Sequence, residues 1–171
     1  PIREDGPETH FKKAGTPTMG GLMILISAGI SILLWADISN PYVWIVAGVM
    51  IGFGLVGAAD YYAKLTKKSH HGIPGRVRLM FELGIASCAI AAYLHFTPNS
   101  IDTGLAIPFM KDYLVPLGIF FIPFSMLVIV GASNAVNLTD GLDGLAIVPV
   151  MIACACFGLI TYFVGHAVYA P

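Results

Sequence analysis

Five long apolar runs divide the chain, and shorter polar segments separate them. The runs lie near residues 19–37, 42–59, 79–96, 114–133 and 145–165. A helix needs about 20 residues to cross a bilayer, and no run alternates polar and apolar positions as a membrane barrel would. The pattern therefore predicts an all-α membrane protein: a polytopic transmembrane helix bundle with five spanning helices in a single domain over residues 1–171. Pro123 and Pro149 fall inside the fourth and fifth runs, where we expect kinks.

The composition agrees with a membrane protein. Hydrophobic residues make up 57% of the chain and charged residues only 11%, whereas a soluble domain carries roughly twice that charged fraction. The mean hydropathy is +0.81. The three cysteines lie inside apolar runs without the spacing of metal ligands, so we interpret them as packing residues.

The basic residues indicate how the chain is oriented in the membrane. Only Lys111 lies between the third and fourth runs. The other eight of the nine basic residues precede the first run or separate the second from the third: Arg3, Lys12, Lys13, Lys64, Lys67, Lys68, Arg76 and Arg78. With alternating sides, these eight share one face, which the positive-inside rule makes cytoplasmic. Three polar segments, residues 1–21, 60–78 and 134–145, are therefore expected to meet at the cytoplasmic surface.

The third polar segment contains two carboxylates close to the ends of two apolar runs. Asp140 and Asp143 are three residues apart, so they would share one face of a helix. Gly141 and Gly144 carry no side chain and allow a ligand to approach the backbone closely. Polar groups at such a junction often mark a functional site, and this spacing suits a nucleotide or a metal–phosphate group. An ordinary polar loop between helices has the same composition, and the two interpretations are about equally supported.

The second polar segment combines an acidic residue with many cations. Asp60 ends the second run, and Lys64 follows four residues later, so a helical ion pair is expected. Glu82 lies one turn beyond Arg78 and is expected to pair with it in a structural role. The basic segment would attract a phosphorylated lipid or a nucleotide diphosphate, although positive-inside bias alone explains much of its charge.

Taken together, the three segments resemble the phospho-N-acetylmuramoyl-pentapeptide transferase (MraY) family. Residues 6–11, Gly-Pro-Glu-Thr-His-Phe, and residues 15–21, Gly-Thr-Pro-Thr-Met-Gly-Gly, resemble the family's first cytoplasmic loop. Residues 134–146, NAVNLTDGLDGLA, resemble its signature more closely than the versions in relatives that use other sugar nucleotides. The segment that begins at Asp60 resembles the family's Asp-Asp-Tyr-x-Lys motif. The resemblance extends over essentially the whole chain, and its motifs are long and occur in order.

The resemblance implies a reaction, a cofactor and partners. The family transfers phospho-MurNAc-pentapeptide from UDP-MurNAc-pentapeptide to undecaprenyl phosphate, which gives lipid I and UMP in peptidoglycan biosynthesis and requires Mg2+. A multi-pass protein of the bacterial inner membrane is implied, surrounded by membrane lipid, with its active-site loops in the cytoplasm. Nucleic acid is not an expected partner, and whether the chain forms a homodimer stays open.

The resemblance also assigns roles to individual residues. Asp60 matches a carboxylate proposed to deprotonate or position the lipid phosphate, and Tyr61 stands where the family has a second Asp. Lys64 and Lys68 match basic residues that face the phosphates, and Asp140 is the candidate Mg2+ ligand. The residues that match the nucleotide-binding stretch are Asn137, Asp140, Gly141, Leu142 and Asp143, and those that match the loop bordering the cleft are Lys13, Thr16 and Thr18.

The chain also departs from the family, and other functions stay open. Tyr61 is the first departure. The second is that the sequence ends at Pro171, so we expect a fragment that lacks a later metal-binding Asp, a His-rich loop and a preceding helix. We expect such a fragment to be inactive alone. One alternative is a related polyprenyl-phosphate transferase that uses UDP-GlcNAc. Another is a transporter-like helix bundle or proton relay with Asp60 and Glu82 as intramembrane carboxylates.

Overall fold

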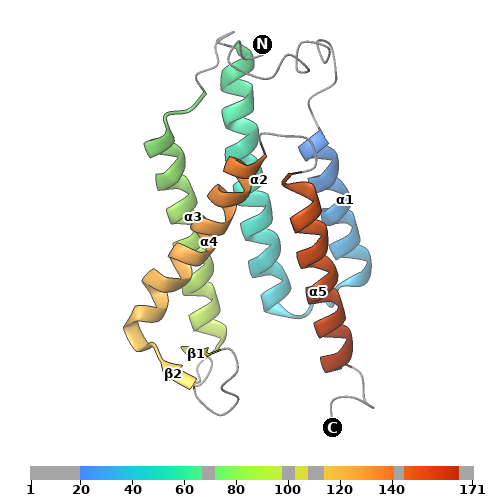
Figure 1. Ribbon diagram of the computed structural model, residues 1–171, viewed down its shortest axis with the longest axis vertical. Coiled ribbons are helices and arrows are strands. Elements are labelled where there is room, and N and C mark those ends of the chain that lie inside the picture. The colour runs from blue at the N-terminus through green and yellow to red at the C-terminus, as the bar shows by residue number, and fades with distance from the viewer. Residues whose placement is uncertain (1–19, 67–71, 98–102, 108–113, 141–144, 166–171) are drawn as a thin grey trace. The chain divides into compact units, whose positions relative to one another are not determined.

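The computed structural model describes residues 20–66, 72–97, 103–107, 114–140 and 145–165, and in this part of the chain most residues are helical (Figure 1). The α-helices are α1 (Gly20–Trp35), α2 (Pro41–Thr66), α3 (Gly75–Phe96), α4 (Phe121–Thr139) and α5 (Ile147–Gly165). Between α3 and α4, the described residues include the strands β1 (Gly104–Ala106) and β2 (Leu114–Pro116) and the 3-10 helix η3 (Gly118–Phe120). Four helices, with η3 counted as part of α4, are long and apolar enough to cross a membrane, and α1 is a shorter apolar helix. The prediction of an all-α polytopic membrane protein is confirmed.

The helices begin and end at different residues from the apolar runs. α2 continues past residue 59 to Thr66, so Asp60 and Lys64 lie on a helix rather than in a loop. The run that starts at residue 114 begins as strand β2, which pairs antiparallel with β1. α4 then continues through Thr139, so the first residues of the third polar segment are helical. Hydropathy locates the apolar part of a helix, but the backbone hydrogen bonds extend into polar sequence.

The two prolines occupy positions that a helix tolerates. Pro123 is the third residue of α4, and Pro149 is the third residue of α5. The first N–H groups of a helix have no partner within it, so a proline in the first turn removes no helical hydrogen bond. The physical cause of the expected kink is therefore absent at Pro149, whereas Pro123 is preceded directly by η3 and the kink expected there stays a prediction.

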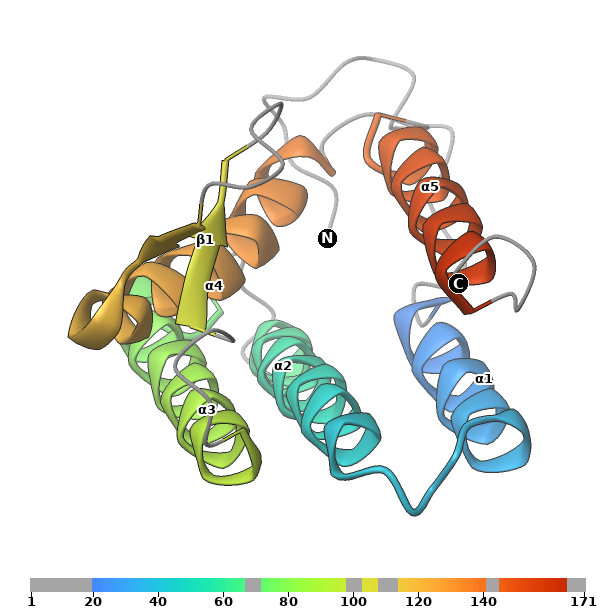
Figure 2. The same ribbon diagram turned by 90° about the horizontal axis from the view of Figure 1, so that it is seen from below.

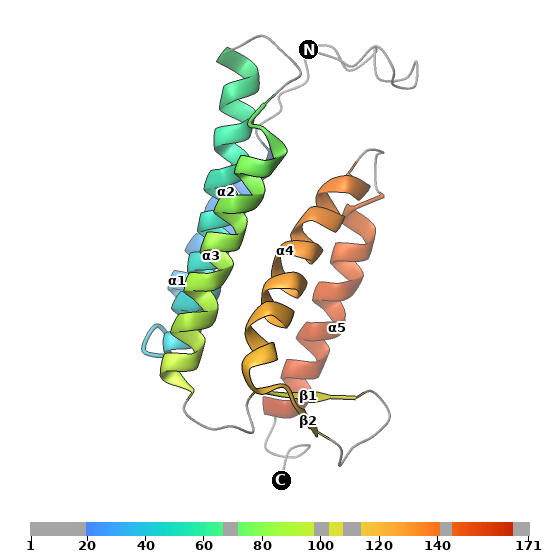
Figure 3. The same cartoon turned by 90° about the vertical axis from the view of Figure 1, so that its left-hand side faces the viewer.

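The chain forms two compact units, Pro1–Met126 and Leu127–Pro171. In the first unit, α2 lies between α1 and α3 and contacts both (Figure 2). Figure 3 shows α2 and α3 side by side along their length. A Cβ added at Gly52 would lie 3.0 Å from the side chain of Ile85 on α3, and one at Gly54 would lie only 2.5 Å from the side chain of Leu25 on α1. Small residues at such contacts let membrane helices approach closely, as they do on both sides of α2.

The turn between α1 and α2 is closed by side-chain hydrogen bonds. Asp37 Oδ1 accepts hydrogen bonds from the Ser39 amide at 3.0 Å and the Ser39 hydroxyl at 2.5 Å. These bonds stabilise the charged carboxylate and hold the pKa of Asp37 below its ordinary value. Trp44 Nε1 donates to the Ile38 carbonyl at 2.8 Å. The Asp37 carboxylate and the Trp44 indole N–H therefore both find hydrogen-bond partners within the turn itself.

Tyr42 connects the start of α2 to the end of α3. Its hydroxyl lies 2.6 Å from Thr97 Oγ1, and its ring centroid lies 5.9 Å from that of Tyr93. Tyr93 stacks in turn on Phe121, with 5.8 Å between the centroids. Thr97 is only 8% exposed, and this contact gives its hydroxyl a polar side-chain partner.

We predict that Tyr42→Phe lowers the free energy of unfolding by about 0.5–1.5 kcal/mol, because the ring contact stays and the hydrogen bond to Thr97 is lost. Tyr62→Phe is the matched control, since Tyr62 is 68% exposed on the same helix. Unfolding of the purified protein in detergent measures both. Equal stabilities of the two variants would show that the Tyr42 hydroxyl contributes nothing.

Candidate functional site

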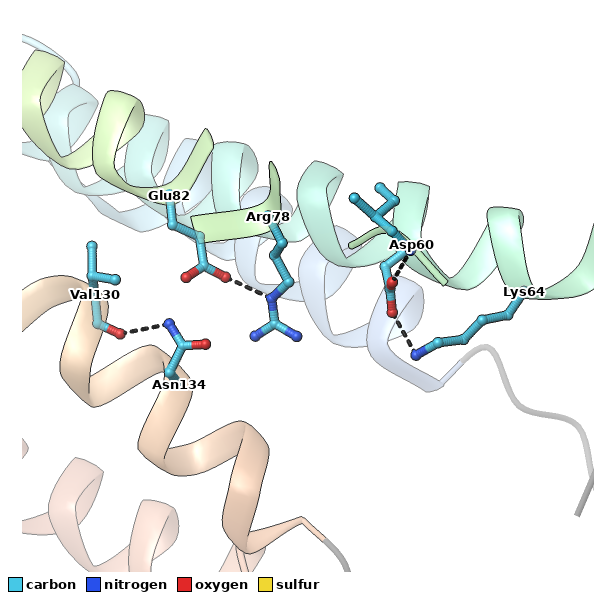
Figure 4. Close-up of polar contacts among 7 residues, drawn as sticks. Asp60, Lys64, Arg78, Glu82, Val130 and Asn134 are labelled. Carbon is cyan, nitrogen blue, oxygen red and sulfur yellow. Dashed lines mark hydrogen bonds and ion pairs between the residues drawn. The ribbon is translucent and has the colours of Figure 1, made fainter. Parts of the chain in front are cut away.

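The end of α2 holds a carboxylate that is bound from two directions. Asp60 Oδ2 lies 2.5 Å from Lys64 Nζ, and Asp60 Oδ1 accepts a hydrogen bond of 2.8 Å from the Ile73 amide (Figure 4). The Asp60 side chain is 14% exposed and the Lys64 side chain 42% exposed. The predicted ion pair between Asp60 and Lys64 is confirmed. The carboxylate is held in place, while the ammonium group stays accessible.

The segment before α3 passes directly over this ion pair. A Cβ added at Gly72 would lie 2.7 Å from Lys64 Cε and 2.8 Å from Asp60 Cγ, closer than real Cβ atoms approach. It would also collide with Asp60 Oδ1. Only glycine lets the backbone come near enough for the Ile73 amide to donate to Asp60. Gly72 therefore belongs to the construction of the site.

A second ion pair lies on the first turns of α3. Arg78 Nε is 2.8 Å from Glu82 Oε1, and the Glu82 side chain is only 3% exposed (Figure 4). Both residues make further contacts. The predicted pairing is confirmed. A carboxylate buried to this extent in an apolar helix is costly without a cation, so Arg78 makes the burial of Glu82 tolerable.

In the second unit, the polar stretch starts within α4. Asn134 Nδ2 donates to the Val130 carbonyl at 2.9 Å (Figure 4), and the Asp140 amide donates to the Val136 carbonyl at 3.1 Å. Asn137 and Asp140 are exposed at the end of the helix. Because they are three residues apart, both lie on one face of this helix end. An amide and a carboxylate are therefore presented together to solvent or to a ligand.

Several predicted site residues lie outside the part of the chain that the structure describes: Lys13, Thr16, Thr18, Lys68, Gly141, Leu142 and Asp143. Their roles stay predictions. Tyr61, next to Asp60, is half-buried and has a contact partner. Sequence reasoning missed Gly72 and the Ile73 amide. Their only sequence signal is a glycine directly before the apolar residue that leads into α3.

The described carboxylates suit Mg2+ only through a contact with a single carboxylate. Among the described residues, no three His, Cys, Asp or Glu side chains are grouped to hold a metal ion. Both oxygens of Asp60 already have a partner, whereas Asp140 is exposed. Mg2+ commonly binds one or two carboxylates together with substrate phosphates and water. Asp140 suits such a single-carboxylate contact.

Two comparisons with known families cover the regions that hold these residues. Residues 42–171 match the family described as Glycosyl transferase family 4. Residues 13–25 match the Phospho-N-acetylmuramoyl-pentapeptide-transferase signature 1. The first match contains the ion pairs on α2 and α3 and the end of α4. The second contains the predicted first-loop residues Lys13, Thr16 and Thr18.

We predict that Arg78→Ala destabilises the protein by about 3–5 kcal/mol, because it leaves the buried Glu82 carboxylate without its cation. Arg76→Ala, at an exposed position on the same helix turn, is the control and is expected to change stability by less than about 0.5 kcal/mol. The double variant Arg78→Leu/Glu82→Leu removes both charges and should recover most of the loss. Detergent unfolding curves of the three variants test this, and a double variant as unstable as Arg78→Ala would contradict it.

Proposed function

We propose a function from the premise that this chain belongs to glycosyl transferase family 4, whose match covers residues 42–171. The family makes the chain a transferase of sugar phosphates to a polyprenyl phosphate. The finer proposal is that the donor is UDP-MurNAc-pentapeptide, the acceptor undecaprenyl phosphate, and the products lipid I and UMP. The observation that carries it is the signature match over residues 13–25.

The proposed reaction exchanges one phosphate bond for another. An oxygen of the acceptor phosphate forms a bond to the phosphorus that carries the sugar. The bond between that phosphorus and the bridging oxygen breaks, and UMP leaves with this oxygen. Such transfers depend mainly on positioning and on neutralising charge around the phosphoryl oxygens. The protein must therefore bring together two substrates whose phosphates repel each other.

Asp60 and Lys64 are suited to this task. An ammonium group has three N–H donors. The ion pair with Asp60 occupies one side of the Lys64 ammonium group, and the Lys64 side chain is 42% exposed. Lys64 can thus contact a phosphate while Asp60 fixes its position. We propose that Lys64 binds phosphate oxygens and that Asp60 orients the acceptor phosphate or takes up its proton. The Ile73 amide keeps the carboxylate from rotating away.

The end of α4 is proposed to contact the donor. Asn137 and Asp140 are exposed on one helix face, and we propose that Asn137 contacts the nucleotide and Asp140 helps to hold Mg2+. When bound, the ion neutralises charge that develops on the phosphates. Lys13, Thr16, Thr18, Lys68, Gly141, Leu142 and Asp143 keep their predicted roles in substrate binding as part of this proposal.

The location follows from the same proposal. We propose that the protein lies in the bacterial inner membrane with the Asp60 end of α2 in the cytoplasm, surrounded by membrane lipid. Within the described residues, four helices that are long and apolar enough to cross a membrane support a multi-pass location. A water-soluble nucleotide and a lipid acceptor can meet only at the membrane surface, and the ends of α2 and α4 carry polar groups suited to that boundary.

In the full-length context expected for this chain, the proposal predicts UMP release from UDP-MurNAc-pentapeptide and undecaprenyl phosphate, and a strong dependence on Asp60. Asp60→Asn should lower kcat by about 10²–10⁴-fold if the carboxylate transfers a proton. Gly72→Ala should lower it by about 10²-fold, because the new methyl group displaces Asp60 and Lys64. Gly75→Ala is the matched control, since a Cβ there meets nothing within 4 Å.

UDP-GlcNAc serves as the competing donor in the same assay. A higher kcat/KM for UDP-GlcNAc than for UDP-MurNAc-pentapeptide would contradict the proposed donor and favour the related transferases that use UDP-GlcNAc. If Asp60→Asn and Gly72→Ala left kcat unchanged, the proposed role of the Asp60–Lys64 ion pair in the reaction would be wrong.

A further prediction concerns Tyr61, which stands where the resembling family has a carboxylate. Tyrosine has an unperturbed pKa of about 10 and is neutral near pH 7. If a carboxylate here helps to bind Mg2+ or to orient Lys64, the lost contact costs about 1.5–3 kcal/mol. Tyr61→Asp is therefore expected to raise activity at limiting Mg2+ by at least about tenfold. A magnesium titration of UMP release compares tyrosine and aspartate at this position in the full-length context expected for this chain, and superimposable curves would show that this side chain has no influence on the site.

A further inference from the structure

An apolar groove lies between α2 and α3, entirely within the first compact unit. Its volume is about 450 Å³, and it is separate from the two ion pairs. The residues that line it are apolar except for the Cys88 thiol, and they include Gly48 and Gly52 of α2 and Met80 and Gly84 of α3. The absence of side chains at the glycines creates the hollow.

This space is not filled by the described part of the chain. A Cβ added at Gly48 or Gly84 would meet nothing within 4 Å. At Gly52, by contrast, it would lie 3.0 Å from Ile85, so the two helices touch there and form the floor. An empty apolar groove loses dispersion contacts on its open side, and hydrocarbon is the material that supplies them in a bilayer.

The length of the groove matches one leaflet. Along α3 it extends from Met80 to Ala89, which is about 14 Å at the helical rise of 1.5 Å per residue. Half of a hydrocarbon core of about 30 Å is about 15 Å. The groove therefore accommodates the depth of a single acyl chain, whereas an undecaprenyl chain is far longer.

An exposed cation, Arg76, lies beyond one end of the groove. Arg76 precedes Met80 by one helical turn and so lies on the same face of α3. It is exposed and makes no ion pair or hydrogen bond with any described residue. Lys64 and Arg78, the other described cations at this end, are paired with Asp60 and Glu82. Arg76 also lies at the N-terminal, positive end of the α3 dipole, which favours an anion there.

We propose that this groove binds one acyl chain of an anionic phospholipid, with the lipid phosphate at Arg76. The apolar lining accepts the acyl chain, the length of the groove suits an occupant as deep as one leaflet, and the exposed Arg76 guanidinium favours an anionic head group. This lipid is distinct from the acceptor, whose phosphate is assigned to Asp60 and Lys64. Binding this lipid would stabilise the contact between α2 and α3.

The experiment uses a tryptophan at the rim of the groove and brominated lipids that quench its fluorescence. The reporter is Phe81→Trp, at a lining residue that is 60% exposed, in a background in which Trp35 and Trp44 are replaced by Phe. The purified protein is placed in two series of bilayers that contain increasing fractions of either dibrominated phosphatidylglycerol or dibrominated phosphatidylcholine. We expect phosphatidylglycerol to quench at a lower fraction of lipid than phosphatidylcholine.

Three variants identify the cause of that preference. Arg76→Gln should reduce the preference for phosphatidylglycerol about fivefold, the loss of one basic contact with an anionic lipid. Gly48→Leu/Gly84→Leu fills the groove and should abolish the preference. Gly57→Leu is the matched control on α2, because a Cβ there meets nothing within 4 Å and Gly57 does not line the groove; it should keep the preference. Arg76→Gln leaves the helix contact unchanged and decides the question if the leucine variants fail to fold.

Other occupants give different results, and each overturns the proposal. Equal quenching by the two lipids would mean ordinary contact with the bilayer. Loss of quenching when undecaprenyl phosphate is added in stoichiometric amount would assign the groove to the acceptor chain. No quenching by either lipid would mean that protein, from this chain or from a second copy, covers the groove.

Discussion

The structure depends on one constraint: a charge in apolar surroundings needs a partner. Asp60 and Glu82 are 14% and 3% exposed, and each has a cation four residues away on its own helix. The pairs differ in one respect. Glu82 is enclosed and serves the helix, whereas the Lys64 partner of Asp60 is 42% exposed and can contact a substrate. Burial thus separates a structural ion pair from a candidate catalytic one with the same spacing.

Glycine has two different uses around α2. At Gly52 and Gly54, the missing side chain lets α2 approach its neighbours on two sides. At Gly72, it lets a backbone segment approach the side chains of Asp60 and Lys64. The first use sets the spacing of the helices, and the second fixes the geometry of the charged end. Where a glycine has no neighbour, as at Gly48 and Gly84, the same lack of a side chain leaves a groove for a molecule from outside the chain.

The sequence predicted the features that depend on local spacing. The two ion pairs follow from the four-residue interval on a helix, and the apolar runs follow from composition, so both could be recognised without coordinates. The hydrogen bond from the Ile73 amide to Asp60 joins residues 13 positions apart, and no periodicity indicates it. Strand β2 was taken for helix because Leu-Val-Pro is as apolar as the helix that follows. Only the pairing of β2 with β1 distinguishes this strand from the helix that follows it.

The position of Asp60 near the end of a helix, rather than in a loop, bears on how a transferase at this place would work. A loop lysine would lose side-chain and backbone freedom each time it bound a phosphate. Here the helix fixes the backbone of Lys64, and the Asp60 carboxylate, itself held by the Ile73 amide, restricts the side chain before a substrate arrives. Part of the entropy cost of ordering the cation is therefore met by folding. The same attachment makes the site sensitive to Gly72, a residue without a functional group, because the clearance at this one position keeps the three partners in contact.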